Sequence, residues 1–174
     1  MLSTQLQIDV IRGRFLKLNK ARIERTQELM LPTQRDLLEL LPLLFHLNVP
    51  ELPGYVDQNT PAGVFSYILD DKLFEAAKRQ WGGGFDPQKT GIWSYDIESI
   101  FLMGSCGTVA FNRKSDFDVW LCHRAELDDY ALSRLKKKAS RIERWFESIG
   151  LEVHFFLMNA AAFKRGDVIT LSSE

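Results

Sequence analysis

Residues 101–120 read FLMGSCGTVAFNRKSDFDVW, and this stretch predicts more about the chain than any other. An apolar run ends at Gly104-Ser105, about ten residues follow, and Asp116 and Asp118 then stand within a second apolar run. Because the side chains of a strand alternate between its two faces, both carboxylates are expected on the same face. Two carboxylates so close together repel each other unless a cation lies between them. Oxygen ligands of this kind suit a magnesium ion that carries the phosphates of a nucleotide.

The two segments that flank this pair predict the rest of a phosphate site. Gly104 removes the side chain where a backbone must approach a phosphate, and Ser105 with the N–H groups after it can hold the phosphate oxygens. Residues 151–158, LEVHFFLM, predict a further strand that carries Glu152. Beside Asp116 and Asp118, Glu152 would complete a three-carboxylate site for two metal ions about 3.5–4 Å apart, the usual arrangement for an in-line displacement at phosphorus.

Each of these pieces also has a purely structural explanation. A Gly-Ser pair after a strand is usually a turn, an Asp-x-Asp pair can mark a solvated sheet edge, and Glu152 alone is typical of an exposed strand residue. Aspartate disfavours strands, however, and Phe117 and Val119 argue against a fully wet one. The order and spacing of all three pieces together favour a site.

Hydrophobic spacing along the chain predicts an α+β fold. The expected fold is a short mixed β-sheet that carries the carboxylates and is backed by helices, with a helical subregion at the N-terminus. We expect the helical subregion over residues 1–92 and the catalytic core over residues 93–174, with a hinge at 82–87. The expected helices are 8–31, a leucine-rich helix after Pro32 that Pro42 kinks or breaks, 70–81 and 128–150; the expected strands are 97–103, 117–122 and 151–158.

The helix expected over 128–150 begins after a favourable N-cap, Asp128, and ends at Gly150. Its basic side chains are expected to face solvent, as the basic face of such a helix usually does. The apolar stripe is Leu135, Ala139, Ile142, Phe146 and Ile149, and the basic residues are Lys136, Lys137, Lys138, Arg141 and Arg144.

Composition excludes several classes of protein. The net charge of −1 provides no overall attraction to nucleic acid or to anionic lipid. The two cysteines, Cys106 and Cys122, form neither a disulfide framework nor a C-x-x-C zinc pair, so a reducing cytoplasmic setting is expected. The N-terminus lacks the pattern of a signal peptide, and no apolar run approaches the roughly 20 residues of a membrane helix, so membrane insertion is not expected.

The motif of Gly104-Ser105 followed by Ser115-Asp116-Phe117-Asp118 resembles the signature of the polymerase-beta-like nucleotidyltransferase superfamily. A second resemblance, to the N-terminal catalytic region of bacterial class I adenylate cyclases, extends over nearly the whole chain. The segments that carry it are LLPLLFH (40–46), LPGYVD (52–57) with PAG (61–63), MGS (103–105), SDFDVWLCH (115–123) and GLEVHFFL (150–157).

This resemblance implies formation of cyclic AMP and pyrophosphate from ATP by two-metal intramolecular nucleotidyl transfer. It implies that Gly104, Ser105 and Ser115 form the phosphate site, and that Asp116 and Asp118 bind Mg²⁺ or Mn²⁺. Glu152 matches the third acidic position, which is the weakest part of the superfamily pattern.

The family continues beyond residue 174 into a regulatory region, so we expect a chain truncated at its C-terminal end, with weak or no activity alone. Two alternatives remain open: an intermolecular nucleotidyltransferase, and a non-catalytic nucleotide-binding module.

Overall fold

The computed structural model describes residues 2–82, 94–108, 110–112 and 115–165. The chain forms six helices and three strands within these ranges: α1 (Leu2–Glu28), α2 (Pro32–Glu39), α3 (Leu41–His46), α4 (Asp71–Trp81), β1 (Ile97–Leu102), β2 (Phe117–His123), α5 (Asp129–Ser148), β3 (Val153–Asn159) and α6 (Ala160–Arg165). None of the helices in the described ranges has the length and apolar character needed to cross a membrane.

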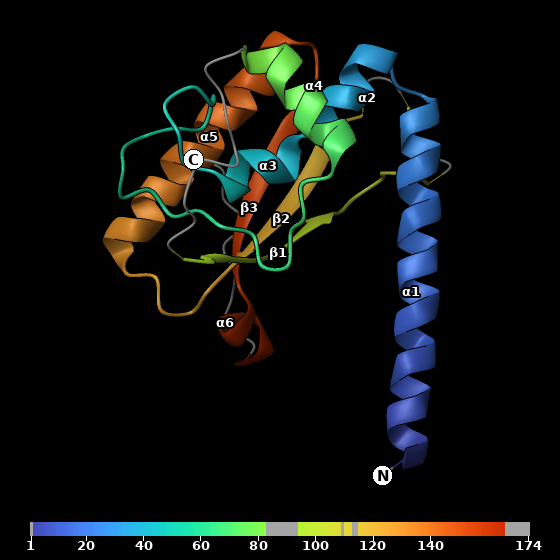
Figure 1. Cartoon of the computed structure of the whole chain (residues 1–174). Coiled ribbons are helices and arrows are strands. Elements are labelled where there is room, and N and C mark those ends of the chain that lie inside the picture. The colour runs from blue at the N-terminus through green and yellow to red at the C-terminus, as the bar shows by residue number, and fades with distance from the viewer. Residues whose placement is uncertain (1, 83–93, 109, 113–114, 166–174) are drawn as a thin grey trace.

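The strands form one mixed sheet in the order β1-β2-β3, which confirms the α+β prediction (Figure 1). β1 and β2 run antiparallel, with Leu102 opposite Val119, while β2 and β3 run parallel, with Asp118 level with His154. The parallel pair requires a crossover connection, and α5 provides it. The sheet therefore brings the start of β2 beside the end of β1 and the start of β3.

One face of the sheet packs on the core. The side chains of β2 alternate strictly between buried and half-buried, and Val119 and Leu121 are among the buried ones. The α5 residues Leu135, Ile142 and Phe146 are fully buried, as their helical spacing predicts. The N-terminal half contributes to the same core through α3, where the ring of Phe45 contacts that of Phe155 with centroids 4.9 Å apart.

The local signals for helix ends are well matched by the structure. Asp128 caps α5 by accepting a hydrogen bond from the amide of Ala131 at 2.7 Å. Asp70 does the same for α4 with the amide of Leu73 at 2.8 Å. Pro42 lies in the first turn of α3, so it separates α3 from α2 rather than kinking one helix. The boundary expected between 92 and 93, and the hinge beyond Gly82, lie outside the described residues.

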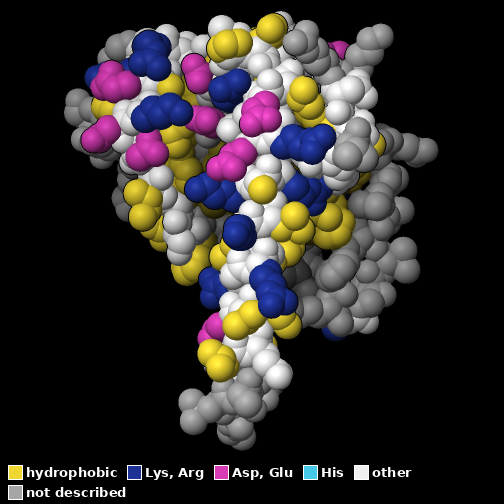
Figure 2. Space-filling view, turned by 90° about the vertical axis from the view of Figure 1, so that its right-hand side faces the viewer, with side chains coloured by type: hydrophobic (Ala, Val, Ile, Leu, Met, Phe, Trp, Pro, Cys, Tyr) yellow, Lys and Arg dark blue, Asp and Glu magenta, His cyan; other side chains and the backbone are white. Residues whose placement is uncertain are grey.

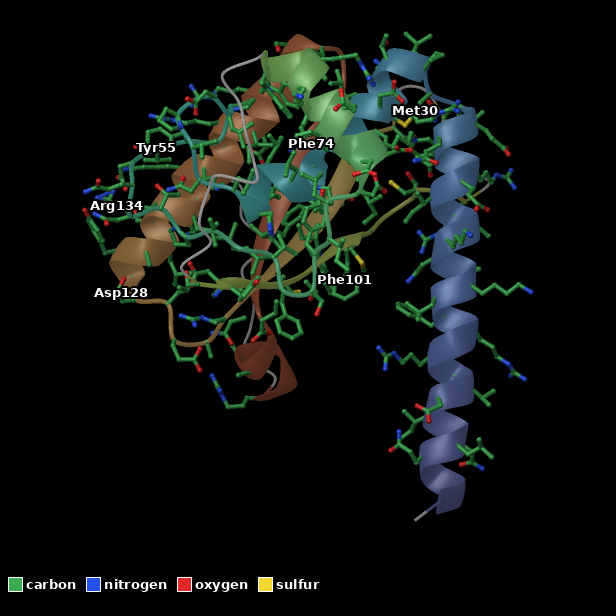
Figure 3. The ribbon with its side chains drawn as sticks, in the orientation of Figure 1. Met30, Tyr55, Phe74, Phe101, Asp128 and Arg134 are labelled. Carbon is green, nitrogen blue, oxygen red and sulfur yellow. The ribbon has the colours of Figure 1, made fainter. Side chains whose placement is uncertain are left out.

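Helix α1 differs from the other helices because most of it projects away from the rest of the molecule (Figure 1). Basic and apolar side chains alternate along its exposed length in Figure 2, and Figure 3 shows the side chains of its lower turns in open space. The helical spacing of its apolar residues therefore predicts the helix correctly without marking a buried face. The exposed large apolar residues of α1 are Leu6, Ile8, Val10, Ile11, Phe15, Leu16, Leu18 and Ile23.

One basic residue of α5 contradicts the expectation that all of them face solvent. Lys138 is only 1% exposed, and its ammonium group donates a hydrogen bond to the backbone carbonyl of Leu47 at 2.7 Å. Burial lowers the pKa of Lys138 to about 7, although Asp96 acts in the opposite direction. Because position 138 lies next to the apolar stripe on the helix, the loop after α3 covers it.

Candidate functional site

The carboxylates of Asp116 and Asp118 lie at the start of β2. Asp118 is the second residue of the strand and is half-buried, whereas Asp116 immediately precedes the strand and is exposed. Phe117 and Val119 point into the core, so alternation places both carboxylates on the opposite face of the sheet. The backbone carbonyl of Asp118 accepts a hydrogen bond from the amide of Met103 at 2.7 Å, which fixes the residue before Gly104 against β2.

Gly104 lies directly against the carboxylate of Asp118. Its φ angle is +67°, a conformation that favours glycine. A Cβ atom at this position would lie 2.7 Å from Oδ2 of Asp118, which is too close for any ordinary contact. Two segments that the sequence predicted to act together are therefore adjacent, and the absence of a side chain at Gly104 leaves room for the Asp118 carboxylate.

The residues after Gly104 form a tight turn. The carbonyl of Ser105 accepts hydrogen bonds from the amide of Thr108 at 2.9 Å and from the Thr108 hydroxyl at 2.7 Å. Gly107, the third residue of this turn, has a φ angle of +69°. A type II β-turn requires a positive φ at its third residue, and glycine adopts it most easily. The Ser105 side chain is half-buried.

Opposite charges converge around the side chain of Cys106. The thiol is buried, and burial raises its pKa to about 11. The guanidinium of Arg22 acts to lower this pKa, and the carboxylates of Asp118 and Asp116 act to raise it. The turn is thus close to one cation from α1 and to two anions at the start of β2.

Glu152 and Ser115 lie farther along the same edge of the sheet. Glu152 precedes β3 rather than belonging to it, and its carbonyl accepts a hydrogen bond from the amide of Phe117 at 2.9 Å. The strand register continues to a position where Glu152 is level with Asp116, on the face that carries the two aspartates. Its exposed carboxylate pairs with His154 at 3.2 Å. The hydroxyl of Ser115 accepts a hydrogen bond from the amide of Asn112 at 3.0 Å.

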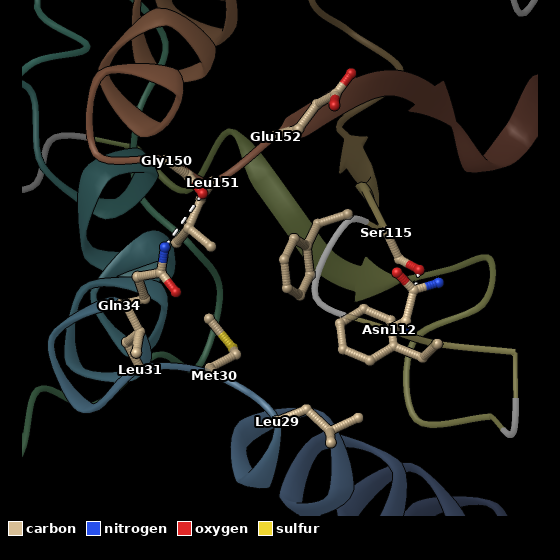
Figure 4. A pocket seen from close by; sticks show the side chains of 11 residues that line it. Leu29, Met30, Leu31, Gln34, Asn112, Ser115, Gly150, Leu151 and Glu152 are labelled. Carbon is tan, nitrogen blue, oxygen red and sulfur yellow. Dashed lines mark hydrogen bonds between the residues drawn. The ribbon is translucent and has the colours of Figure 1, made fainter.

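A cavity of about 410 Å³ opens beside these residues, between the end of α1, the start of α2 and the start of β3 (Figure 4). Ser115 and Glu152 line it together with Gln34, whose amide nitrogen donates a hydrogen bond to the carbonyl of Gly150 at 3.2 Å. Gly104, Ser105, Asp116 and Asp118 are not among its lining residues. Of the predicted site residues, Ser115 and Glu152 therefore line the cavity, and the others lie outside it.

The donor set can be compared with what a metal ion requires. Within the described ranges, no three histidine, cysteine, aspartate or glutamate side chains are arranged to hold a metal ion together. Magnesium, however, is usually held by one or two carboxylates together with substrate phosphates and water. Asp116 and Asp118 fit that simpler requirement, and the role of Glu152 as a third ligand stays a prediction.

Sequence reasoning did not identify Arg22 as part of this site. Its side chain donates hydrogen bonds to the carbonyls of Gly104 and Cys106, more than eighty residues later in the chain. One local signal was available: Arg22 follows Leu18 by four residues, so it continues the apolar stripe of α1 with a charged residue at its end. A charged residue in line with an apolar stripe indicates that the surroundings of the helix face change at that point, although it does not say which element lies there.

Comparison with known proteins gives a consistent result. The sequence-family model described as the adenylate cyclase NT domain matches residues 7–174 of this chain. The chain is 34% identical over 173 residues to an adenylate cyclase of Yersinia pestis, and 32% identical to adenylate cyclases of Salmonella typhimurium and Escherichia coli. Each alignment covers 97% of this chain and 20% of the relative, so the chain spans about one fifth of the length of these proteins. No solved structure matches the chain.

The family match includes the whole sheet, the turn after Gly104 and both aspartates. This chain belongs to the adenylate cyclase N-terminal domain family, and its sequence is similar to the N-terminal region of class I adenylate cyclases.

Proposed function

We propose that this chain is the ATP-binding catalytic region of an adenylate cyclase that converts ATP to 3′,5′-cyclic AMP and pyrophosphate. The observation that supports this most directly is the contact of Gly104 with the carboxylate of Asp118. It brings a glycine turn suited to phosphate beside carboxylates suited to magnesium, and the names of the relatives supply the reaction. The alternatives of an acceptor other than ATP itself, or of nucleotide binding without turnover, become outcomes of the test below.

The roles of the residues follow from their positions. The backbone of Gly104 and Ser105 would bind the triphosphate, and Asp116 and Asp118 would hold Mg²⁺ or Mn²⁺ against it. Ser115 would help by fixing the chain just before Asp116, since its hydroxyl accepts a hydrogen bond from the amide of Asn112. Glu152 is proposed as a third acidic ligand: one of its carboxylate oxygens pairs with His154, and the other oxygen would bind the metal ion.

The reaction forms a bond between the ribose 3′-oxygen and the α-phosphorus of the same ATP molecule, and it breaks the bond from that phosphorus to the oxygen that bridges the α- and β-phosphates. When bound, two metal ions would lower the pKa of the 3′-hydroxyl and neutralise the leaving pyrophosphate. The role of this chain would be to hold the triphosphate so that the 3′-hydroxyl and the leaving oxygen lie in line. The 3′-hydroxyl loses its proton as it attacks, and pyrophosphate leaves with the electron pair of the broken bond.

About four fifths of each relative lies outside the matched region. We propose that this additional region contains the regulatory part and supplies what the 174 residues need for full turnover. Nucleic acid binding and membrane insertion are not part of the proposal, and a cytoplasmic location stays a prediction.

The test compares Asp118→Asn with Asp129→Asn, which removes an exposed aspartate from the first turn of α5 at the far end of β2. Magnesium-dependent ATP binding is measured for the 174-residue chain, and product is measured for that chain and for one extended to the length of the relatives. We expect Asp118→Asn to lose magnesium-dependent binding while Asp129→Asn keeps it, and the extended chain to make cyclic AMP faster.

Three results would contradict parts of this proposal. Unchanged magnesium-dependent ATP affinity in Asp118→Asn would remove the metal assignment. An adenylylated acceptor in place of cyclic AMP would identify an intermolecular transferase. ATP binding without any product in the extended chain would leave only a nucleotide-binding module.

A further inference from the structure

Helix α1 is attached to the turn after Gly104 by one side chain. The Nε atom of Arg22 donates a hydrogen bond to the carbonyl of Cys106 at 2.9 Å, and Nη2 donates one to the carbonyl of Gly104 at 3.0 Å. The planar guanidinium thus bridges two alternate carbonyls of one short turn. A lysine has no such fork and could not hold both carbonyls in the same geometry.

These two hydrogen bonds set the direction of two amide groups. The chain has no cis peptide bond among its described residues, and in a trans peptide the N–H points away from the C=O of the same unit. The N–H groups of Ser105 and Gly107 therefore point away from Arg22. In the described part of the chain neither amide donates to a protein acceptor. Successive N–H groups of this kind, exposed on one side of a turn, form an anion-binding concavity.

The backbone of α1 lies directly behind this turn. A Cβ atom on Gly107 would lie 2.3 Å from the carbonyl oxygen of Arg22 and 2.5 Å from its Cα atom. Thr26, one helical turn farther along, is 1% exposed, and its hydroxyl donates a hydrogen bond to the same carbonyl of Arg22 at 2.9 Å. The helix is thus packed tightly against the turn at Arg22, while its earlier turns project into open space (Figure 1).

The positive charge of Arg22 also suits a position beside a turn that binds phosphate. Arg22 and Asp118 both lie close to Gly104: Arg22 donates a hydrogen bond to its carbonyl, and a Cβ atom on Gly104 would lie 2.7 Å from Oδ2 of Asp118. A triphosphate in front of the turn would bring several negative charges close to two carboxylates. A guanidinium behind the turn, hydrogen-bonded through the peptide dipoles, strengthens the donor character of the amides in front.

We propose that Arg22 is a positioning residue of the phosphate site: it holds the Gly104–Gly107 turn so that the amides of Ser105 and Gly107 point toward the triphosphate. This inference rests on the proposed function, because it requires that the turn binds phosphate. It makes α1 a structural part of the nucleotide site.

The experiment compares Arg22→Gln, Arg22→Lys and the control Arg25→Gln, which removes an exposed charge from the same helix. Affinities for magnesium–ATP and for adenosine are measured on the 174-residue chain by calorimetry. We expect Arg22→Gln to weaken magnesium–ATP binding by about 10- to 100-fold, as loss of a supporting hydrogen-bond partner commonly does, with little change for adenosine. Arg22→Lys should lie closer to Arg22→Gln than to the unchanged chain, and Arg25→Gln should bind as the unchanged chain does.

Hydrogen exchange of the backbone provides a measurement that needs no nucleotide. The amides of Met103 and Thr108 are hydrogen-bonded at the two ends of the turn, and both should exchange faster in Arg22→Gln than in Arg25→Gln. Equal exchange in the two variants would overturn the inference. So would full recovery of magnesium–ATP binding in Arg22→Lys, which would indicate a need for charge alone, or an equal loss of both ligands in Arg22→Gln.

The variant Gly104→Val separates failure of this inference from failure of the proposed function. If Gly104→Val loses magnesium–ATP binding while Arg22→Gln keeps it, the turn binds phosphate and Arg22 does not position it. If Gly104→Val and the unchanged chain bind magnesium–ATP equally, the turn is not the phosphate site. In that case the phosphate site of the proposed function is wrong, and the proposed role of Arg22 is wrong as well.

Discussion

Replacing Gly104 with alanine perturbs the site by a single methyl group. The new Cβ atom would lie 2.7 Å from Oδ2 of Asp118, and 3.6 Å from the carboxylate carbon. The carboxylate oxygen is the end of a flexible side chain, so it can retreat. It would have to move by roughly 1 Å to reach an ordinary van der Waals separation of about 3.5 Å or more. The substitution therefore displaces the proposed metal ligand without removing it.

Two separate effects follow from this change. The φ angle of +67° costs an L-residue about 1–2 kcal/mol, which should lower the melting temperature by about 2–4 °C per kcal/mol for a chain of this length. The displacement of Asp118 should affect ligand binding more strongly than stability. A misplacement of about 1 Å can reduce the rate of an enzymatic reaction by about 100-fold, and we expect magnesium-dependent ATP affinity to fall by at least tenfold.

Gly82→Ala is a control for positive-φ strain away from the site, and its strain should be at least as large, because a φ of +84° with a ψ of 178° is a conformation that only glycine adopts readily. Gly82 follows α4, has a φ angle of +84°, and its added Cβ atom would meet no heavy atom within 4 Å. Thermal unfolding and calorimetric titration with ATP, each with and without magnesium, are measured for both variants. Both variants should unfold a few degrees below the unchanged chain, and only Gly104→Ala should lose magnesium-dependent affinity.

The reasoning would be refuted by a variant Gly104→Ala that shares the stability loss of Gly82→Ala and binds magnesium–ATP normally. In that case the contact of Gly104 with Asp118 would be a packing feature alone. A loss of affinity that is equal with and without magnesium would instead locate the effect on the phosphate and not on the metal ligand.

Two further predictions concern single carboxylate and ammonium groups. Manganese alone, or magnesium with ATP, should raise the melting temperature. Glu152→Gln should reduce this gain, whereas the exposed control Glu126→Gln should keep it. An unreduced gain in Glu152→Gln would exclude Glu152 as a ligand. Burial lowers the pKa of Lys138 to about 7, so between that pH and the ordinary value of 10.5 the unfolded chain binds the extra proton. The free energy of unfolding should then rise with pH above 7, by at most about 1.4 kcal/mol per pH unit. Lys138→Met should remove this rise, and equal pH slopes of the melting temperature between about pH 7 and 8.5 in both proteins would contradict it.

Local signals in the sequence predict most of the secondary structure of the site. The alternation around Asp118 predicts β2, and the cap at Asp128 with the apolar spacing that ends at Phe146 predicts α5. Strand β3 begins at Val153, two residues later than expected, so Glu152 precedes the strand. These elements were predictable because capping and hydrophobic periodicity act over a few residues, and the chain carries both signals in full.

The sequence by itself determined which residue types stand at the site, because Gly104, Asp116 and Asp118 carry their chemistry wherever the chain folds. Only the tertiary structure decided what surrounds them. It placed Arg22 against the turn after Gly104, paired Glu152 with His154, and buried the ammonium group of Lys138. Helical spacing shows that a face exists, but not whether another element covers it. Covering depends on contacts between residues far apart in the chain, and no local pattern encodes those contacts.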